Sequence, residues 1–126
     1  MPKPQVIPNI HTPEYFFEEG CHITEWWNSP EDDQVSIARA RVEPGMTTRW
    51  HRLRETTERY VILEGQGRVE IGVLAPQTVT TGDVVVIPPG VRQRITNTGD
   101  SDLVFLAICT PRFVPGCYED AESETA

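Results

Sequence analysis

The sequence is poor in lysine and in basic charge. Lys3 is the only lysine, and the 126 residues carry a formal net charge of -8 at pH 7. Proteins that bind a nucleic-acid phosphate backbone normally present a basic face. The charge therefore argues against nucleic acid as a partner.

Long apolar runs are also missing. The longest, such as 84–89 and 103–109, have the length of a β-strand and are far too short to cross a bilayer. No segment combines the charged, apolar and small-residue regions of a signal peptide. We therefore expect no membrane insertion.

Cysteine is scarce and unpaired in pattern. Cys21, Cys109 and Cys117 form an odd set without CxxC spacing, which predicts free thiols in a reduced, cytoplasmic setting. Cys109 ends an apolar segment and has no His or Lys at a motif spacing to lower its pKa. We interpret it as a buried small apolar residue rather than a nucleophile.

No long window shows helical periodicity. Short segments bounded by Gly, Pro, Asn or Asp have strand character instead: 21–27, 35–42, 49–53, 59–63, 67–73, 84–87, 92–97 and 103–109. A chain of this length is about one domain, and many short strands indicate a sandwich or a barrel.

The two ends of the chain differ in composition from its middle. Four prolines in the first 13 residues predict an extended arm, and the acidic Ser/Glu segment after Tyr118 predicts a frayed end. We therefore divide the single domain into an arm with a first strand (1–34), a barrel (35–113) and an acidic tail (114–126). The arm and the adjacent Trp26 and Trp27, of which only one can face inward, predict a homodimer.

Two spaced motifs lie within the predicted barrel. The first has Gly45, His51, Glu58 and Gly65 at its fixed positions, and the second has Gly82, Pro88, Gly90 and Asn97. Together they resemble the paired signatures of the cupin superfamily, over roughly 37–109. The resemblance implies an all-β fold, a double-stranded β-helix or jelly-roll barrel. Leu53 stands where the first motif has its second His, and Gln93 stands where the second motif has its His.

The resemblance implies a metal site formed by His51, Glu58 and Gln93. The common open redox set has two imidazoles and one carboxylate, whereas these positions offer one imidazole. We expect a weakly held divalent transition metal (Fe, Mn, Ni or Zn), with His22 or His11 as a further ligand, or no metal at all. In the metal-free case, the same three residues form a hydrogen-bonded polar cluster in an apolar pocket.

Arginines gather in the two motifs. Strand alternation predicts that Arg49 faces inward beside His51, where its guanidinium binds Glu58 or an acidic substrate. Gln93 is the second expected substrate-binding residue. The outward-facing arginines are expected to be solvated or to pair with Glu55, Glu64 and Glu70; they are Arg52, Arg54, Arg92 and Arg94.

Three functions remain open at this stage. The first is a metal-dependent oxygenase, isomerase or lyase acting on a small anionic molecule. The second is a non-catalytic module that binds or senses a small molecule. The third is a metal-free isomerase or epimerase with His51 as the base and Tyr60 as the acid, although Tyr60 also suits a purely structural place in the core.

Overall fold

The computed structural model describes residues 2–8 and 12–124 and is almost entirely β-structure. Its strands are β1 (Tyr15–Phe17), β2 (Cys21–Trp27), β3 (Ser36–Val42), β4 (His51–Leu53), β5 (Thr57–Glu64), β6 (Gln66–Ile71), β7 (Gln77–Thr80), β8 (Val84–Ile87), β9 (Gln93–Asn97), β10 (Leu103–Thr110) and β11 (Tyr118–Asp120), with one 3-10 turn, η1 (Pro115–Cys117). The predicted all-β class is confirmed.

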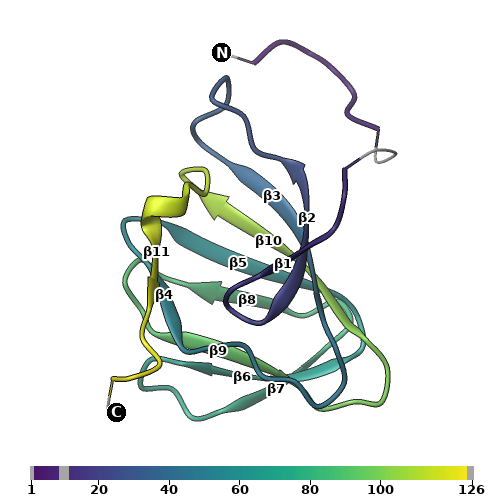
Figure 1. Cartoon of the computed structure of the whole chain (residues 1–126), viewed down its shortest axis with the longest axis vertical. Coiled ribbons are helices and arrows are strands. Elements are labelled where there is room, and N and C mark those ends of the chain that lie inside the picture. Colours follow the sequence, from purple (N-terminus) through teal and green to yellow (C-terminus); the bar gives the residue numbers. More distant parts are fainter. Residues whose placement is uncertain (1, 9–11, 125–126) are drawn as a thin grey trace.

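Two antiparallel sheets form the layers of a double-stranded β-helix (Figure 1). One has six strands in the order β1-β2-β3-β10-β5-β8, and the other has five in the order β11-β4-β9-β6-β7. Side chains alternate across each strand, so every second residue faces the interior. On β5 these are Glu58, Tyr60 and Ile62, all buried, and on β9 they include Ile95, which has no exposed surface.

Gly65 illustrates why the motif glycines specify this fold. It joins β5 to β6 with φ of +90°, a conformation that L side chains rarely adopt. A Cβ atom here would lie 2.7 Å from the backbone oxygen of Asp102. The tight turn between the two sheets therefore requires glycine at this position.

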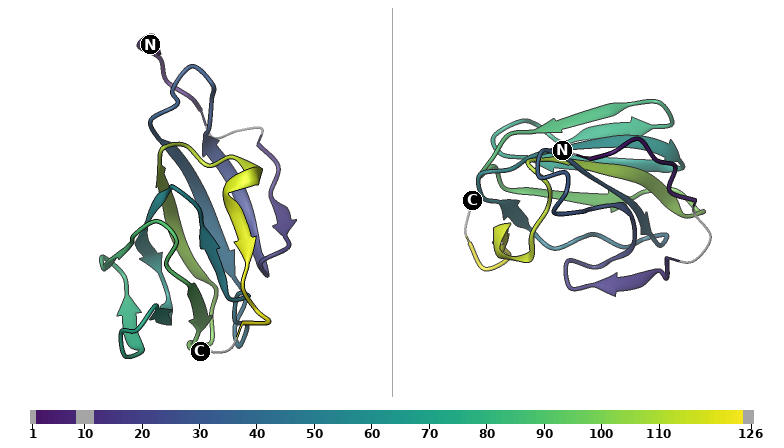
Figure 2. Two further views of the ribbon diagram at one scale, coloured as in Figure 1. Left: turned by 90° about the vertical axis from the view of Figure 1, so that its left-hand side faces the viewer. Right: turned by 90° about the horizontal axis from the view of Figure 1, so that it is seen from above.

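The described segments near the two ends of the chain, 15–17 and 118–121, are more ordered than the sequence predicted. Residues 15–17, assigned to the arm, form β1 and pair with β2. The prediction of a frayed tail is wrong, because β11 pairs with β4 and Ala121 has no exposed surface. Figure 1 shows this last segment in yellow beside β4, while Figure 2 (left) shows the first residues projecting beyond the strands.

Arginine side chains explain why the acidic tail is held. Arg52 on β4, one of four arginines expected to be solvated or to pair with Glu55, Glu64 and Glu70, instead forms ion pairs with Glu119 and Glu124. Arg94, from the same group of arginines, does pair with Glu70, at 2.6 Å. Arg92 and Arg94 also lie over the indole ring of Trp50, 4.0 and 4.4 Å from its centroid.

Within the described ranges, no helix is long and apolar enough to span a membrane.

Candidate active site

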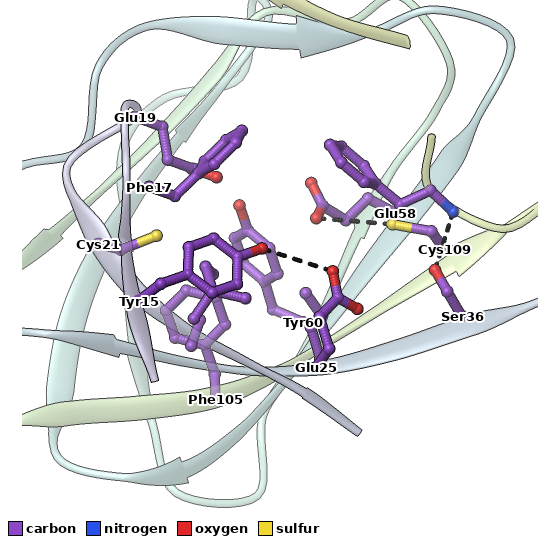
Figure 3. A pocket seen from close by; sticks show the side chains of 15 residues that line it. Tyr15, Phe17, Glu19, Cys21, Glu25, Ser36, Glu58, Tyr60, Phe105 and Cys109 are labelled. Carbon is purple, nitrogen blue, oxygen red and sulfur yellow. Dashed lines mark hydrogen bonds between the residues drawn. The ribbon is translucent and has the colours of Figure 1, made fainter. Parts of the chain in front are cut away.

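A pocket that opens to solvent lies against the inner face of the six-stranded sheet (Figure 3). Its polar lining includes the carboxylates of Glu19, Glu25 and Glu58. Its apolar lining combines aliphatic and small residues with five aromatic ones: Tyr15, Phe17, Tyr60, Phe105 and Phe113. A concave apolar site with a few convergent polar groups is the usual form of a small-molecule site.

Glu58 is the most strongly perturbed acid in this pocket. Its carboxylate oxygen Oε1 accepts a hydrogen bond from Gln93 Nε2 at 3.0 Å, and the Cys109 thiol lies 3.8 Å from Oε2. Burial raises the pKa of Glu58 to about 7, and the negative charge of Glu19 adds to the rise; His51 opposes it to a smaller extent. Near neutral pH, Glu58 can therefore either donate or accept a proton.

Gln93 is fixed between two pocket residues. The Tyr60 hydroxyl donates to Gln93 Oε1 at 2.7 Å, which orients the amide so that its nitrogen donates to Glu58. Gln93 is 1% exposed and lies behind the pocket wall, whereas Tyr60 forms part of that wall. Burial raises the pKa of Tyr60 well above its usual value. The hydroxyl thus holds the amide in place, and the acid role predicted for Tyr60 stays a prediction.

His51 contacts Glu19, a residue that the motifs did not indicate. His51 Nδ1 lies 2.7 Å from the backbone oxygen of Arg49; a carbonyl only accepts, so Nδ1 carries a proton. Nε2 faces Glu19 Oε2 at 3.3 Å. A deprotonated Nε2 and a carboxylate are both acceptors, so this contact is favourable only when one proton lies between them. The imidazole also stacks on Tyr118, at 5.4 Å between ring centroids.

Glu19 reaches the pocket through chain topology rather than through a strand pattern. It lies in the turn between β1 and β2, where Gly20 has φ of +103°. The sequence offered no signal for it beyond a turn-forming glycine after an aromatic run. His51 itself is 1% exposed and lies behind Glu19, so Glu19 and Glu58 present acidic groups directly to the pocket.

The predicted inward orientation of Arg49 is wrong. Its side chain is 49% exposed, and its Nε lies 2.6 Å from Asp120 Oδ2. Strand β4 begins only at His51, so the alternation that was extrapolated from His51 does not apply to Arg49. Only the backbone oxygen of Arg49 serves the site, as the acceptor for His51.

The residues at the metal-ligand positions do not fit a metal centre. His51 Nε2 faces Glu19, the oxygens of Glu58 contact Gln93 and Cys109, and the buried Leu53 supplies no donor. His22 Nε2 lies instead 3.2 Å from Glu43, and His11 falls outside the described residues. Among residues 2–8 and 12–124, no group of three or more His, Cys, Asp or Glu is arranged to hold a metal ion. Three convergent donors are the usual minimum for such a site.

Cys109 and Cys21 add thiols to the pocket wall. Burial raises the pKa of both thiols, mainly because it removes the water that would stabilise the charged thiolate. The described cysteines are free and buried, in agreement with the prediction of a buried, unreactive Cys109.

Comparison with known proteins gives a family. Residues 38–109, more than half of the chain, match the family model described as Cupin domain. No curated protein matches the chain in sequence.

Solved structures of low sequence identity share the fold. Pac13, described as a nucleoside dehydratase, is 15% identical with a TM-score of 0.79 over 95% of this chain and 92% of that one. A Streptomyces PAC13 variant solved with uridine is 16% identical, with a TM-score of 0.72 over 86% and 83%. A Klebsiella pneumoniae protein with a double-stranded beta-helix domain is 14% identical, with a TM-score of 0.70 over 82% and 85%.

Proposed function

Because this chain belongs to the cupin domain family, we propose that its barrel pocket binds a small molecule, and that the chain is an isomerase or lyase that transfers protons on it. The observation that carries the proposal is the pair of pocket carboxyl groups with different partners. Glu58 is buried with a pKa of about 7, and Glu19 faces the imidazole of His51. Titratable groups in such contrasting environments are typical of acid and base assignments.

The two groups divide the work of one proton transfer. Glu19 takes a proton from a carbon of the substrate, and His51 stabilises the charges around it from behind. The protonated form of Glu58 gives a proton to the leaving oxygen of a lyase substrate, or to the second carbon of an isomerase substrate. Exchange with water then returns each carboxyl group to its starting state. Tyr60 and Gln93 keep the carboxyl group of Glu58 in position.

The likeness to a nucleoside dehydratase supports this reaction class. Removal of water from a substrate takes away a proton and a hydroxyl group, which is the chemistry that a base and an acid in one pocket provide. The structural likeness extends over 95% of this chain. For this chain, the proposed reaction class rests on its own carboxyl groups. The likeness to Pac13 supports the barrel pocket as the place of the reaction.

Two features of the sequence-based hypothesis change. An anionic substrate is not retained, because the described pocket lining includes three carboxylates and no lysine or arginine. A metal is not assigned a step, because the donors at its expected positions bind one another or point elsewhere.

We also retain the homodimer as a proposal, with the arm and the outer face of the six-stranded sheet as its contacts. Val6 in the arm is 89% exposed, and Val84 and Val86 on β8 are 60% and 59% exposed. Burial of such apolar surface favours association. Sedimentation of the intact chain and of a Val84→Glu, Val86→Glu variant tests this; equal masses for both would overturn the assigned face.

Proton exchange in heavy water tests the proposed reaction. Purified protein is incubated with aldoses, ketoses, 2-amino sugars and uridine, and NMR follows deuterium incorporation and product formation. We expect turnover of at least one compound by the wild type and a loss of about 100-fold or more in Glu58→Gln. Glu64→Gln, an exposed control on the same strand, should turn the compound over as fast as the wild type does. Binding of any of these compounds without exchange or product would favour the non-catalytic module.

A further inference from the structure

The charge of the pocket is uniformly acidic in the part of the chain that the structure describes. Glu19, Glu25 and Glu58 line it, with no lysine or arginine among the lining residues. His51 lies behind Glu19, and both of its ring nitrogens are engaged, by the backbone oxygen of Arg49 and by Glu19. Glu19 thus has His51 as a partner, whereas no positively charged side chain is among the described lining residues to pair with Glu25.

Glu58 directs an incompletely satisfied oxygen into this space. The residue is 9% exposed, and among the described residues the hydrogen-bond partner of its Oε2 is the weakly donating Cys109 thiol at 3.8 Å (Figure 3). A thiol satisfies a carboxylate oxygen poorly compared with an N–H or O–H donor. A buried carboxylate oxygen without a strong donor is a place where a ligand donor gains most.

Aromatic rings, together with aliphatic and small side chains, form the rest of the pocket lining. Tyr15 and Phe17 approach from β1, and Phe113 from the segment after β10. Phe17 packs edge-on against Phe113, with ring centroids 6.2 Å apart. The Tyr15 hydroxyl points toward Glu25, 3.5 Å from its Oε1, as Figure 3 shows. Aromatic faces combined with carboxylates attract organic cations, whose charge is spread over carbon and nitrogen.

We propose that the pocket accepts an organic cation, an amine or quaternary ammonium group, between the aromatic walls and the carboxylates of Glu19 and Glu25. This inference rests on the proposed small-molecule pocket and names the substrate class. The cationic group lies next to Glu25, which leaves the reacting carbon near Glu19 and Glu58. A neutral molecule of the same shape should bind less tightly, because it makes neither the Coulomb interaction nor the cation–π contact.

A matched pair of probes separates charge from shape. Choline and 3,3-dimethyl-1-butanol have nearly the same form, but only choline carries a positive charge. We expect choline to bind at least about tenfold more tightly in NMR titrations of the intact protein at low salt. Equal affinities, tighter binding of the alcohol, or no binding of choline would overturn the proposal.

Variants locate the cation within the pocket. Glu25→Gln removes the charge next to the proposed cation, where the wild-type carboxylate accepts a hydrogen bond from the Tyr15 hydroxyl. It should weaken choline severalfold and leave the alcohol unchanged. Phe113→Leu should weaken choline to a similar extent, because it removes an aromatic wall at similar volume. Glu64→Gln is the matched control and should change neither affinity. If Glu25→Gln binds choline as the wild type does, the assigned position is wrong. Thermal melts of each variant establish that it folds.

The result is distinguishable from that of the proton-transfer test. Exchange on neutral compounds that depends on Glu58, without choline binding, would overturn the cation proposal alone. Choline binding with no exchange on any panel compound would overturn the proposed catalysis alone.

Discussion

Glu19 Oε2 lies 3.3 Å from His51 Nε2, although the two residues are far apart in the sequence and on different sheets. The contact joins a turn residue of the six-stranded sheet to the first residue of β4 in the other sheet. Because His51 is buried and its Nδ1 donates to a backbone oxygen, the imidazole has one orientation, in which its other nitrogen faces Glu19. Glu19 therefore faces an imidazole, whereas the other catalytic carboxyl group, that of Glu58, contacts Gln93 and Cys109.

If Glu19 and His51 act as one unit, their removal is not additive. Glu19→Gln and His51→Gln should each lower turnover of the substrate found in the exchange test by about 100-fold. The double variant should be about as slow as either single one, since each change already breaks the unit. Steady-state kinetics on all four proteins checks this. Fully multiplicative losses would show that the two residues act independently.

Glu58 makes the stability of the fold depend on pH. Its pKa rises from an ordinary 4.5 to about 7 in the folded chain, so the folded state holds a proton that the unfolded state releases. The contribution is full below pH 4.5, declines as pH rises to about 7 and is then lost, by up to about 3 kcal/mol. Denaturant unfolding across pH 4 to 8 measures it.

Glu58→Gln should remove most of that decline. The glutamine resembles the protonated acid, so the variant should match the wild type near pH 4.5 and exceed it above pH 7. Burial also raises the pKa of Glu25, which leaves a smaller slope in both proteins. The control, Glu64→Gln, should follow the wild type. A wild-type curve that is flat or rises between pH 4.5 and 7 would contradict the pKa of Glu58.

Restoring imidazoles should create a metal site where the present donors do not form one. Gln93 pairs directly with His51 across β4 and β9, so Gln93→His places a second imidazole beside the first. Leu53 shares the buried face of β4 with His51. The double variant Leu53→His, Gln93→His should take up close to one equivalent of Zn²⁺ or Ni²⁺, and the wild type far less. Elemental analysis of untagged protein after reconstitution measures this. Full metal occupancy of the wild type would overturn the conclusion that its residues do not fit a metal centre.

Arg52 should control the order of the C-terminal segment. Arg52→Gln removes the ion pairs to Glu119 and Glu124, and hydrogen exchange in 118–124 should become faster. The free energy of unfolding should fall by less than about 1 kcal/mol, because the pairs lie near the surface. Arg68→Gln, which breaks a pair with Glu70 away from this segment, is the control. Unchanged exchange in 118–124 would show that the strand pairing of β11 suffices.

The residues at the expected metal-ligand positions show which parts of the site could be predicted from the sequence. His51, Leu53 and Gln93 are buried as strand alternation from the motifs predicted, and Glu58 and Tyr60 share one face of β5. Arg49 was misplaced because the alternation was carried two residues before the strand begins. Glu19 was missed because its position depends on how β1 pairs with β2, which no local pattern encodes.

The sequence by itself determined the barrel, because glycines such as Gly65 and the two-residue alternation act through local sterics and burial. Only the tertiary structure decided which groups meet inside it. The turn after β1 places Glu19 beside His51, and Arg49 points outward to form an ion pair with Asp120 on β11. Contacts between segments distant in sequence depend on the packing of the whole chain, so the acidic, aromatic character of the pocket emerged only there.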